Sequence, residues 1–389
     1  MYTEKVRIYP NKTQQKAIDN ILWNCKELYN YLLDLNIRTY KETGESLLGY
    51  DLNKYARIFI KNRIPNRVMR CVIKRLTESF RRFFKKLSRF PKFKSVNKFR
   101  SFTVVEITRG FNFDKNHIKV NSLGKIKAVF TRDLLGVPKQ CTIKKMPSGK
   151  YYAFIQLDDK DVPKVEIDQP EECVAIDLGV SRFYTDENGN YVSSPRFLRR
   201  NLKKLRKVQR ELSRKQKGSR NREKARIKVA RLYEKVANTR RDFHFKVAYF
   251  LVTTFKEVIC EDLRTSKMFL GKDKKSRLAR RALYDVALAS FLVILQQMAN
   301  LYGCKLIKVD PQYTSQICSN CGAIVKKSLS DRVHKCPHCG LEIDRDVNAA
   351  RNILQRGKQL SVGTTGCTSV HQLVEVFIPG TQPVQQAEW

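Results

Sequence analysis

The spacing of apolar and polar residues changes twice along the first half of the chain. Residues 1–10 have the pattern of one short strand that ends at Pro10. Apolar residues between Ile18 and Leu35 then recur at helical spacing. From about Phe102 to Leu157 the period becomes two, over strand-like stretches at 102–107, 117–120, 125–130 and 151–157. The pattern predicts a helical region beside a small antiparallel β domain, which we interpret as a barrel.

The second half of the chain alternates strand-like and helical segments. Two long basic helices are predicted between residues 196 and 250, and a last helix is expected to end at Gly357. Residues 158–170 are expected to be a linker and residues 358–389 a flexible tail. Another helix is predicted at 277–302, and strands at 173–180, 182–185, 191–192, 258–260 and 305–309. Strand hairpins and helices in this order predict a mixed α/β sheet.

The chain carries a large positive charge. Its 77 Lys and Arg residues against 37 Asp and Glu residues give a net charge of +40, and such an excess repels itself unless a polyanion neutralises it. Nucleic acid and an anionic membrane surface are the two candidates. The most apolar stretch, Ala287 to Leu295, is much shorter than the roughly 18–20 residues of a membrane span, and the N-terminus shows no apolar leader. We therefore expect a nucleic-acid partner, no membrane, and a cytoplasmic, nucleoid-associated protein.

Two segments concentrate this charge. Residues 57–100 hold 16 basic residues and one acidic residue, interleaved with phenylalanines, and residues 196–241 hold 20 basic and three acidic residues. A solvated helix face would explain the charge alone, but basic and aromatic residues together favour phosphate neutralisation and base stacking. The candidate nucleic-acid contacts are Arg81, Arg82, Lys85, Lys92 and Lys94 in the first segment and Lys203, Lys207, Arg210 and Arg214 in the second.

Four cysteines have the spacing of a metal site. Cys318 and Cys321 form one C-x-x-C pair, and Cys336 and Cys339 form another after 14 intervening residues. Four thiolates on two tight turns match tetrahedral zinc, and such a closed site leaves no position for a substrate. We therefore expect one structural zinc ion. His334 and His338, which lie beside and inside the second pair, are alternative ligands.

Three carboxylates stand at the ends of predicted elements in the second half. Asp177 ends an apolar strand, Glu261 follows a second strand, and Asp346 precedes the last helix. A buried carboxylate requires a metal, a cation or strong hydrogen bonds, whereas an exposed strand end or a helix N-cap requires none of these. The pattern leaves Asp262 as a rival of Glu261 and Asp344 as a rival of Asp346. In so basic a chain, carboxylates that bind two magnesium ions would suit phosphodiester hydrolysis.

Several motifs together resemble one protein family, the TnpB proteins of insertion-sequence transposons, which are relatives of the type V CRISPR effector nucleases. The resemblance covers most of the chain. The motifs are FPKFK at 90–94, AIDLG at 175–179, NREKAR at 221–226, EDL at 261–263, YTSQ at 313–316 and DRDVNAARN at 344–352.

The resemblance implies an RNase H-like, RuvC-type α/β nuclease domain with an inserted zinc ribbon. It also implies an N-terminal β-barrel wedge domain with an inserted helical recognition lobe. The implied ranges are 1–11 and 89–168 for the wedge, 12–88 for the recognition lobe, 169–312 and 343–357 for the nuclease, 313–342 for the zinc ribbon and 358–389 for the tail.

The same resemblance implies RNA-guided cleavage of double-stranded DNA beside a short transposon-adjacent motif. The guide RNA would be transcribed from the transposon end, with one protein chain per RNA. Asp177, Glu261 and Asp346 would be the catalytic triad that holds two Mg²⁺ ions. The alternatives are a nuclease-dead RNA-guided repressor, a conventional transposase without a guide, and an inactive zinc-ribbon protein that only binds nucleic acid.

Overall fold

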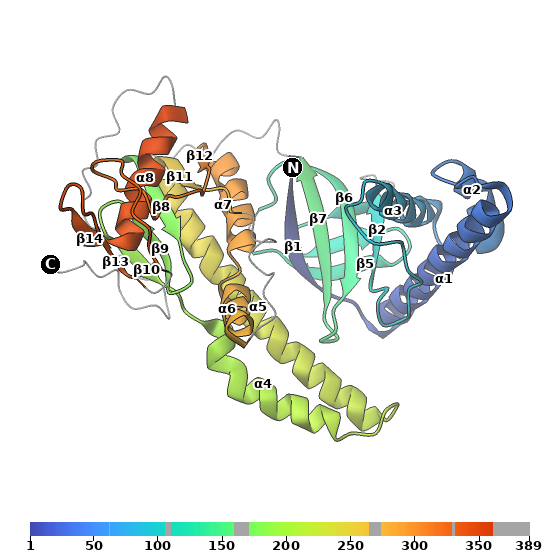
Figure 1. Ribbon diagram of the computed structural model, residues 1–389. Coiled ribbons are helices and arrows are strands. Elements are labelled where there is room, and N and C mark those ends of the chain that lie inside the picture. The colour runs from blue at the N-terminus through green and yellow to red at the C-terminus, as the bar shows by residue number, and fades with distance from the viewer. Residues whose placement is uncertain are drawn as a thin grey trace. The chain divides into compact units, whose positions relative to one another are not determined.

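The computed structural model describes residues 1–61, 63–105, 110–131, 133–158, 171–263, 274–328 and 331–360. The chain divides into two compact units, Met1–Val162 and Pro163–Trp389, and each is described by itself (Figure 1). Almost all of the predicted linker, and the predicted tail beyond residue 360, lie outside the described residues.

A seven-stranded antiparallel sheet forms the scaffold of the first unit. Its strands are β1 (Tyr2–Tyr9), β2 (Ser101–Val105), β3 (Phe111–Phe113), β4 (His117–Val120), β5 (Gly124–Val129), β6 (Val137–Lys145) and β7 (Tyr151–Asp158). Their order is β2-β6-β7-β1-β5-β4-β3. The sheet is curved and nearly closed (Figure 1), but within the described residues no ladder joins its edge strands β2 and β3. The predicted barrel is therefore an almost closed sheet, and β3 and β6 were not predicted.

Three helices complete the first unit: α1 (Lys12–Thr43), α2 (Asp51–Ile60) and α3 (Asn66–Phe84). Asn11 and Gln14 form a capping box at the start of α1, and Gly44 ends that helix in the left-handed region, at φ 75°. Leu28 of α1 and Leu76 of α3 are fully buried in the same apolar core as Ile8 of β1. The helices are thus fixed on the sheet by their apolar faces.

A five-stranded mixed sheet forms the centre of the second unit. Its strands are β8 (Glu171–Leu178), β9 (Arg182–Asp186), β10 (Tyr191–Ser193), β11 (Phe255–Glu261) and β12 (Lys305–Val309). Their order is β10-β9-β8-β11-β12. Strands β8, β11 and β12 run parallel, and β9 and β10 pair antiparallel at one edge. The predicted mixed α/β sheet is therefore confirmed.

Helices cover both faces of this sheet. They are α4 (Phe197–Ser213), α5 (Arg220–Thr254), α6 (Lys274–Val286), α7 (Leu288–Tyr302) and α8 (Arg345–Leu360). Leu251 of α5 and Leu295 of α7 pack with Ile176 of β8 on one face. On the other face, Ile353 of α8 packs with Ala175 of β8. Helices α4 and α5, the two predicted basic helices, form a long hairpin (Figure 1).

The helix predicted at 277–302 is broken. Ala287 adopts left-handed backbone angles, with φ 54°, and separates α6 from α7. The stretch Ala287–Leu295 is by itself too short for a membrane span. The longer segment Leu278–Tyr302, in contrast, is long and apolar enough to cross a membrane by length and composition. Half of its apolar window is buried inside the protein, where Phe291 and Met298 of α7 belong to the core. Packing in that core accounts for the apolar character of this segment.

The last helix does not end at Gly357, as predicted, but continues to Leu360. Gly357 is buried, and a Cβ atom added to it would lie 2.5 Å from Cγ2 of Ile259 in β11. This glycine lets α8 approach the sheet closely. Its role is therefore close packing within the helix, and the prediction that it ends the helix was wrong.

Candidate active site and metal centre

Two of the three predicted carboxylates lie at the ends of neighbouring parallel strands. Because side chains alternate between the faces of a strand, Asp177 lies on the face of β8 that holds Ala175, which is the face covered by α8. Ile176 pairs with Cys260, so the next residues of the two strands, Asp177 and Glu261, stand at the same level. The register of β8 and β11 therefore brings these two carboxylates together.

The same alternation separates Glu261 from its rival. Glu261 is buried, with 7% of its surface exposed, whereas Asp262 is exposed. The backbone N–H of Asp262 donates to the carbonyl of Val309. The hydroxyl of Thr314 donates a 2.5 Å hydrogen bond to Oε1 of Glu261. Glu261 thus has the environment of a functional carboxylate, and Asp262 has that of a surface residue.

The start of helix α8 supplies the third carboxylate. Oδ1 of Asp344 accepts hydrogen bonds from the backbone N–H groups of Asp346 (2.8 Å) and Val347 (3.4 Å), and Oδ2 accepts one from Arg182. Asp344 is therefore the helix N-cap. This leaves the side chain of Asp346 outside the capping role, with hydrogen bonds from Arg345 at 3.2 and 3.3 Å.

The carboxylates act on one another electrostatically. Burial, together with the charges of Glu261 and Asp346, raises the pKa of Asp177 well above its ordinary value, and Arg345 opposes this shift. Burial also raises the pKa of Glu261, against the hydrogen bond from Thr314. Like charges gathered in a partly buried place favour proton or cation binding. The structure thus places Asp177 within electrostatic reach of both Glu261 and Asp346.

The three acids are less closely grouped than the four cysteines. Among the described residues, only the cysteine group has all its ligand atoms within 4.8 Å of one another, so the acids do not form so compact a set. Asp177, Glu261 and Asp346 would each offer carboxylate oxygen to magnesium, which could activate water for phosphodiester hydrolysis. The donor set, all carboxylate oxygen, is also the one magnesium prefers. The assignment of Asp177, Glu261 and Asp346 to magnesium stays a prediction.

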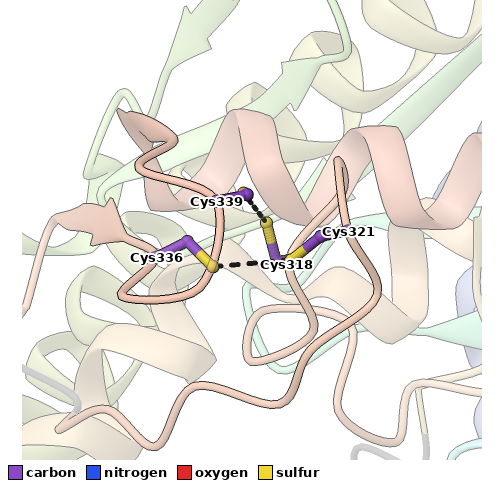
Figure 2. A group of neighbouring side chains, drawn as sticks. All are labelled: Cys318, Cys321, Cys336 and Cys339. Atoms are coloured by element: carbon purple, nitrogen blue, oxygen red, sulfur yellow. Dashed lines mark hydrogen bonds between the residues drawn. The ribbon is translucent and has the colours of Figure 1, made fainter.

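The four predicted cysteines form the second site (Figure 2). The sulfur atoms of Cys318 and Cys339 are 3.6 Å apart, as are those of Cys321 and Cys336, and all four lie within 4.8 Å of one another. Tetrahedral zinc with Zn–S bonds of about 2.3 Å requires sulfur separations of about 3.8 Å. The four thiols therefore fit one zinc ion.

Two equivalent turns produce this geometry. In the first, the N–H of Gly322 donates to the carbonyl of Cys318 (3.0 Å); in the second, the N–H of Gly340 donates to Cys336 (3.0 Å). Both glycines have positive φ, 76° and 73°, which few other residues tolerate. Two short strands, β13 (Val333–Lys335) and β14 (Glu342–Asp344), flank the second turn as an antiparallel pair.

The alternative histidine ligands do not join the sulfur cluster. His338 is exposed, and His334 is fully buried with Nδ1 against the ammonium group of Lys327. That ammonium also donates to the carbonyl of Ser315 (3.1 Å). Within the described part of the chain, neither histidine belongs to the compact metal-binding group.

The predicted nucleic-acid contacts in the second unit lie on one face of α4. Spacings of three and four residues place them along the same side of a helix. With Arg206 and Glu211 they line a shallow groove of about 520 Å³. All four are exposed: Lys203, Lys207, Arg210 and Arg214. The groove has the charge expected of a phosphate-binding surface.

The predicted contacts in the first unit divide into two kinds. Lys94 is partly buried, its backbone exchanges hydrogen bonds of 2.7 and 2.9 Å with the side chain of Asn30, and its ammonium lies 5.5 Å from the ring centre of Tyr29. This lysine therefore also anchors its own segment to α1. The others are exposed: Arg81, Arg82, Lys85 and Lys92.

The aromatic residues of this segment also divide by exposure. Phe80 and Phe99 are buried and cannot stack on bases. Phe84, Phe90 and Phe93 expose 56%, 44% and 55% of their surface. Phe84, Phe90 and Phe93 are thus the exposed phenylalanines of this segment that could stack on bases, while Phe83 is of intermediate exposure.

A basic groove of about 1180 Å³ lies between α2 and α3. Of its basic lining residues, only Arg81 was predicted from the sequence as a candidate nucleic-acid contact. Its basic residues come from two helices, so helical spacing within one segment did not reveal it. They are Lys54, Arg57, Arg70, Lys74 and Arg81.

Sequence reasoning also missed the polar residues that support the carboxylates. Thr314, Asn348 and Asn352 are all buried and connect the first cysteine turn, α8 and Glu261 by hydrogen bonds. The motifs YTSQ and DRDVNAARN contain these residues, but a buried Thr or Asn has no spacing signal that assigns it a role.

Three family models match separate parts of the chain. The model described as "Probable transposase" matches residues 157–271, the "Cas12f1-like, TNB domain" model matches 289–353, and a "Helix-turn-helix domain" model matches 3–45. The last range contains strand β1 and helix α1 in the structure. The second range contains the four cysteines and Asp346.

Known proteins are similar over most of the chain. A protein of Streptomyces pristinaespiralis named "Putative RNA-guided DNA endonuclease" is 28% identical and covers 91% of this chain and 88% of its own length. InsQ of Escherichia coli (strain K12), with the same description, is 29% identical over 75% of each chain. A solved Cas12f1–sgRNA–target DNA complex contains a protein that matches 90% of this chain and 98% of its own, with a TM-score of 0.54 and 15% identity, which supports the fold alone.

Proposed function

The chain belongs to the TnpB family, and from that premise we propose that it is a transposon-associated, RNA-guided DNA endonuclease. The observation that carries the proposal is the electrostatic coupling of Asp177 with Glu261 and Asp346, where β8 and β11 end side by side near the start of α8. A nucleic-acid-binding protein without activity has no need for mutually repelling, partly buried acids. The net charge of +40 supports polyanionic partners, for which we propose a guide RNA and a double-stranded DNA target.

The second unit is proposed to be the nuclease domain. Numbered along the chain, its strands lie in the order 3-2-1-4-5, and we infer an RNase H-like, RuvC-type fold. The segment from 313 to 342 would be the inserted zinc ribbon. In the first unit, the curved sheet would be the wedge domain and α1–α3 the recognition lobe.

The proposed reaction is hydrolysis of a DNA phosphodiester. Bound magnesium would activate water and stabilise the leaving oxygen. Asp177 and Glu261 would present ligand oxygens from fixed strand positions, and Asp346 would present a third from the first turn of α8. Arg345, which contacts Asp346, would keep the site's net charge from growing too negative when no phosphate is present.

The basic surface of α4 is proposed to bind the nucleic-acid backbone. Phosphate contacts position a strand but carry no base sequence, so sequence would be read by guide–target pairing and by a short flanking motif. Neutralising Lys203, Lys207, Arg210 and Arg214 together should weaken binding to every matched target alike. The slope of log binding constant against log salt concentration should become shallower by up to about 0.9 for each lost phosphate contact.

The decisive experiment is retargeting. RNA that copurifies with the protein is sequenced, its guide segment is replaced, and DNA matching the old or new segment is offered with Mg²⁺. We expect cleavage to follow the new segment with no change in the protein. Cleavage of one fixed sequence whatever the RNA would establish a conventional transposase, and guide-dependent binding without any cleavage would establish the repressor.

A further inference from the structure

Thr314 makes the closest contact to the proposed catalytic carboxylate Glu261. Its hydroxyl is 2.5 Å from Oε1 of Glu261 and 3.2 Å from the carbonyl of Pro311. A hydroxyl has one proton to donate, and the shorter bond to a charged acceptor is the stronger. Both side chains are buried, with 4% and 7% of their surface exposed. Water therefore cannot easily replace this bond.

Thr314 is itself held by helix α8. Nδ2 of Asn352 donates to the carbonyl of Thr314 (2.7 Å) and to that of Ile317 (2.7 Å). Asn352 is buried as well, with 3% exposed. The preceding residue, Tyr313, has a left-handed φ of 59°, an arrangement that persists only where surrounding contacts impose it. The turn that presents the hydroxyl is thus fixed from the helix.

The same helix connects this turn to the cysteine site. Nδ2 of Asn348 donates to Ile317 (2.7 Å), and its Oδ1 accepts from the N–H of Ser319 (3.0 Å). Ser319 lies directly after Cys318 in the first cysteine turn. Asn348 and Asn352 are separated by one helical turn, on the helix that begins with Arg345 and Asp346.

We propose that Thr314 is a positioning residue for Glu261. Its hydroxyl donates to Oε1 and fixes the orientation of the carboxylate, which leaves Oε2 available for a metal ion, and Asn352 fixes Thr314. This inference rests on the proposed function, because it assigns Glu261 to metal binding. Partners of this kind, which orient a metal ligand, typically contribute about 10- to 100-fold to metal affinity or activity.

The test compares variants in the guide-RNA complex. Thr314→Val keeps the shape of the side chain but removes the hydroxyl, and Thr314→Ser keeps the hydroxyl. We expect Thr314→Val to need about 10- to 100-fold more Mg²⁺ for half-maximal cleavage, with DNA binding and zinc content unchanged. Thr314→Ser should restore the wild-type requirement to within a few-fold.

A second readout does not depend on cleavage of DNA. Fe²⁺ bound in place of Mg²⁺ and treated with ascorbate and peroxide cuts the nearby protein backbone. Scission near residues 177 and 261 should require correspondingly more Fe²⁺ in Thr314→Val than in the wild type. Asn352→Leu should behave in the same way, and the double variant should be no worse than the poorer single variant.

Gln355 provides the matched control. It lies on α8, is exposed, and donates to the carbonyl of Ser319 (3.2 Å), so it contacts the same loop without reaching Thr314. Gln355→Leu should leave both readouts unchanged.

The inference would be overturned if Thr314→Val needed no more Mg²⁺ than the wild type. It would also be overturned if the variant lost zinc or stability to the same extent as it lost activity. Failure of the wild type to cut guide-matched DNA would instead overturn the proposed function, and the Fe²⁺ scission pattern would still decide the role of Thr314.

Discussion

The cysteine cluster and the carboxylate cluster both adjoin helix α8, yet they are assembled in opposite ways. The four cysteines come from one short segment, Cys318 to Cys339, and two equivalent turns bring them together. The carboxylates come from β8, β11 and the start of α8, which are far apart along the chain. Local structure therefore builds the first cluster, and only the completed sheet builds the second.

The two clusters also differ in their energetics. Four thiolates would complete the coordination of a zinc ion, and binding of that ion would then contribute directly to folding. In the carboxylate cluster, in contrast, burial and repulsion by Glu261 and Asp346 raise the pKa of Asp177. The rest of the fold must hold these like charges together. On the proposed function, the local cluster would contribute stability, and the cluster that is costly to assemble would carry the chemistry.

Removal of the cysteines should give the largest effect on folding. This effect should be confined to the segment that contains the cysteine cluster and leave the carboxylate cluster folded. In Cys336→Ser/Cys339→Ser the zinc ribbon should lose metal-coupled folding free energy on the order of 10 kcal/mol. Metal analysis should find about one zinc per wild-type chain and none in the variant, from the four-ligand geometry. Limited proteolysis should then cut the ribbon and leave the β8–β12 sheet intact. Undiminished zinc in the variant would place the metal elsewhere.

The pH dependence of stability should reveal the packing of α5 and α7 on the sheet face opposite α8. His244 of α5 is buried against Phe183 and Phe291, with Nε2 2.9 Å from the carbonyl of Val286. Burial lowers its pKa to about 4, whereas the unfolded chain binds a proton below pH about 6.5. Stability should therefore fall as the pH decreases from 6.5 to 4, by up to about 3 kcal/mol.

Glutamine at this position isolates the effect of His244. Its amide retains a donor for Val286 but does not titrate, so the difference in unfolding free energy between wild type and His244→Gln should change over this pH range only. This comparison cancels the carboxylates, whose raised pKa values act in the opposite direction. A difference that stays constant from pH 7 to pH 4 would show that folding does not lower the pKa of His244.

A smaller effect is expected where α8 meets the sheet. In Gly357→Ala the new methyl group would meet Ile259, because a Cβ atom at this position would lie 2.5 Å from Cγ2 of that side chain. Overpacking of this kind costs about 1–3 kcal/mol, which thermal unfolding should detect. Combination with Ile259→Ala should cost less than the sum of the single variants. Strict additivity would show that α8 does not pack closely against β11.

What could be predicted from the sequence follows the same division. The cysteine site was predicted in full because C-x-x-C spacing fixes its local geometry. Asp177 and Glu261 were predicted as candidates because each ends an apolar strand. Strand alternation in the sequence could not separate Glu261 from Asp262, and the resemblance to the TnpB family selected Glu261. The residue pattern left Asp344 and Asp346 as rivals, because either could serve as an N-cap, and the resemblance selected Asp346. The hydrogen bonds in the structure then identify Asp344 as the N-cap.

The features that were missed depend on tertiary contacts. Gly357 was taken for a helix end because glycine commonly ends helices, but its role is set by Ile259, which lies far away in the sequence. The break at Ala287 occurs within an uninterrupted apolar pattern. Thr314 has no signal of its own, since its function depends on the position of Glu261. Such residues are recognisable only when the neighbouring strands are in place.

The catalytic role of the carboxylate cluster is tested most directly by cleavage with Asp177→Asn, which keeps the size of the side chain and removes its charge. The guide-RNA complex of this variant is compared with wild type on matched DNA in Mg²⁺, with DNA binding and zinc content measured on the same samples. Asp344→Asn, which retains an N-cap, serves as the control. If Asp177 holds the catalytic metal, cleavage should fall by roughly a thousand-fold or more with binding and zinc unchanged. Cleavage by Asp177→Asn at the wild-type rate would contradict this role.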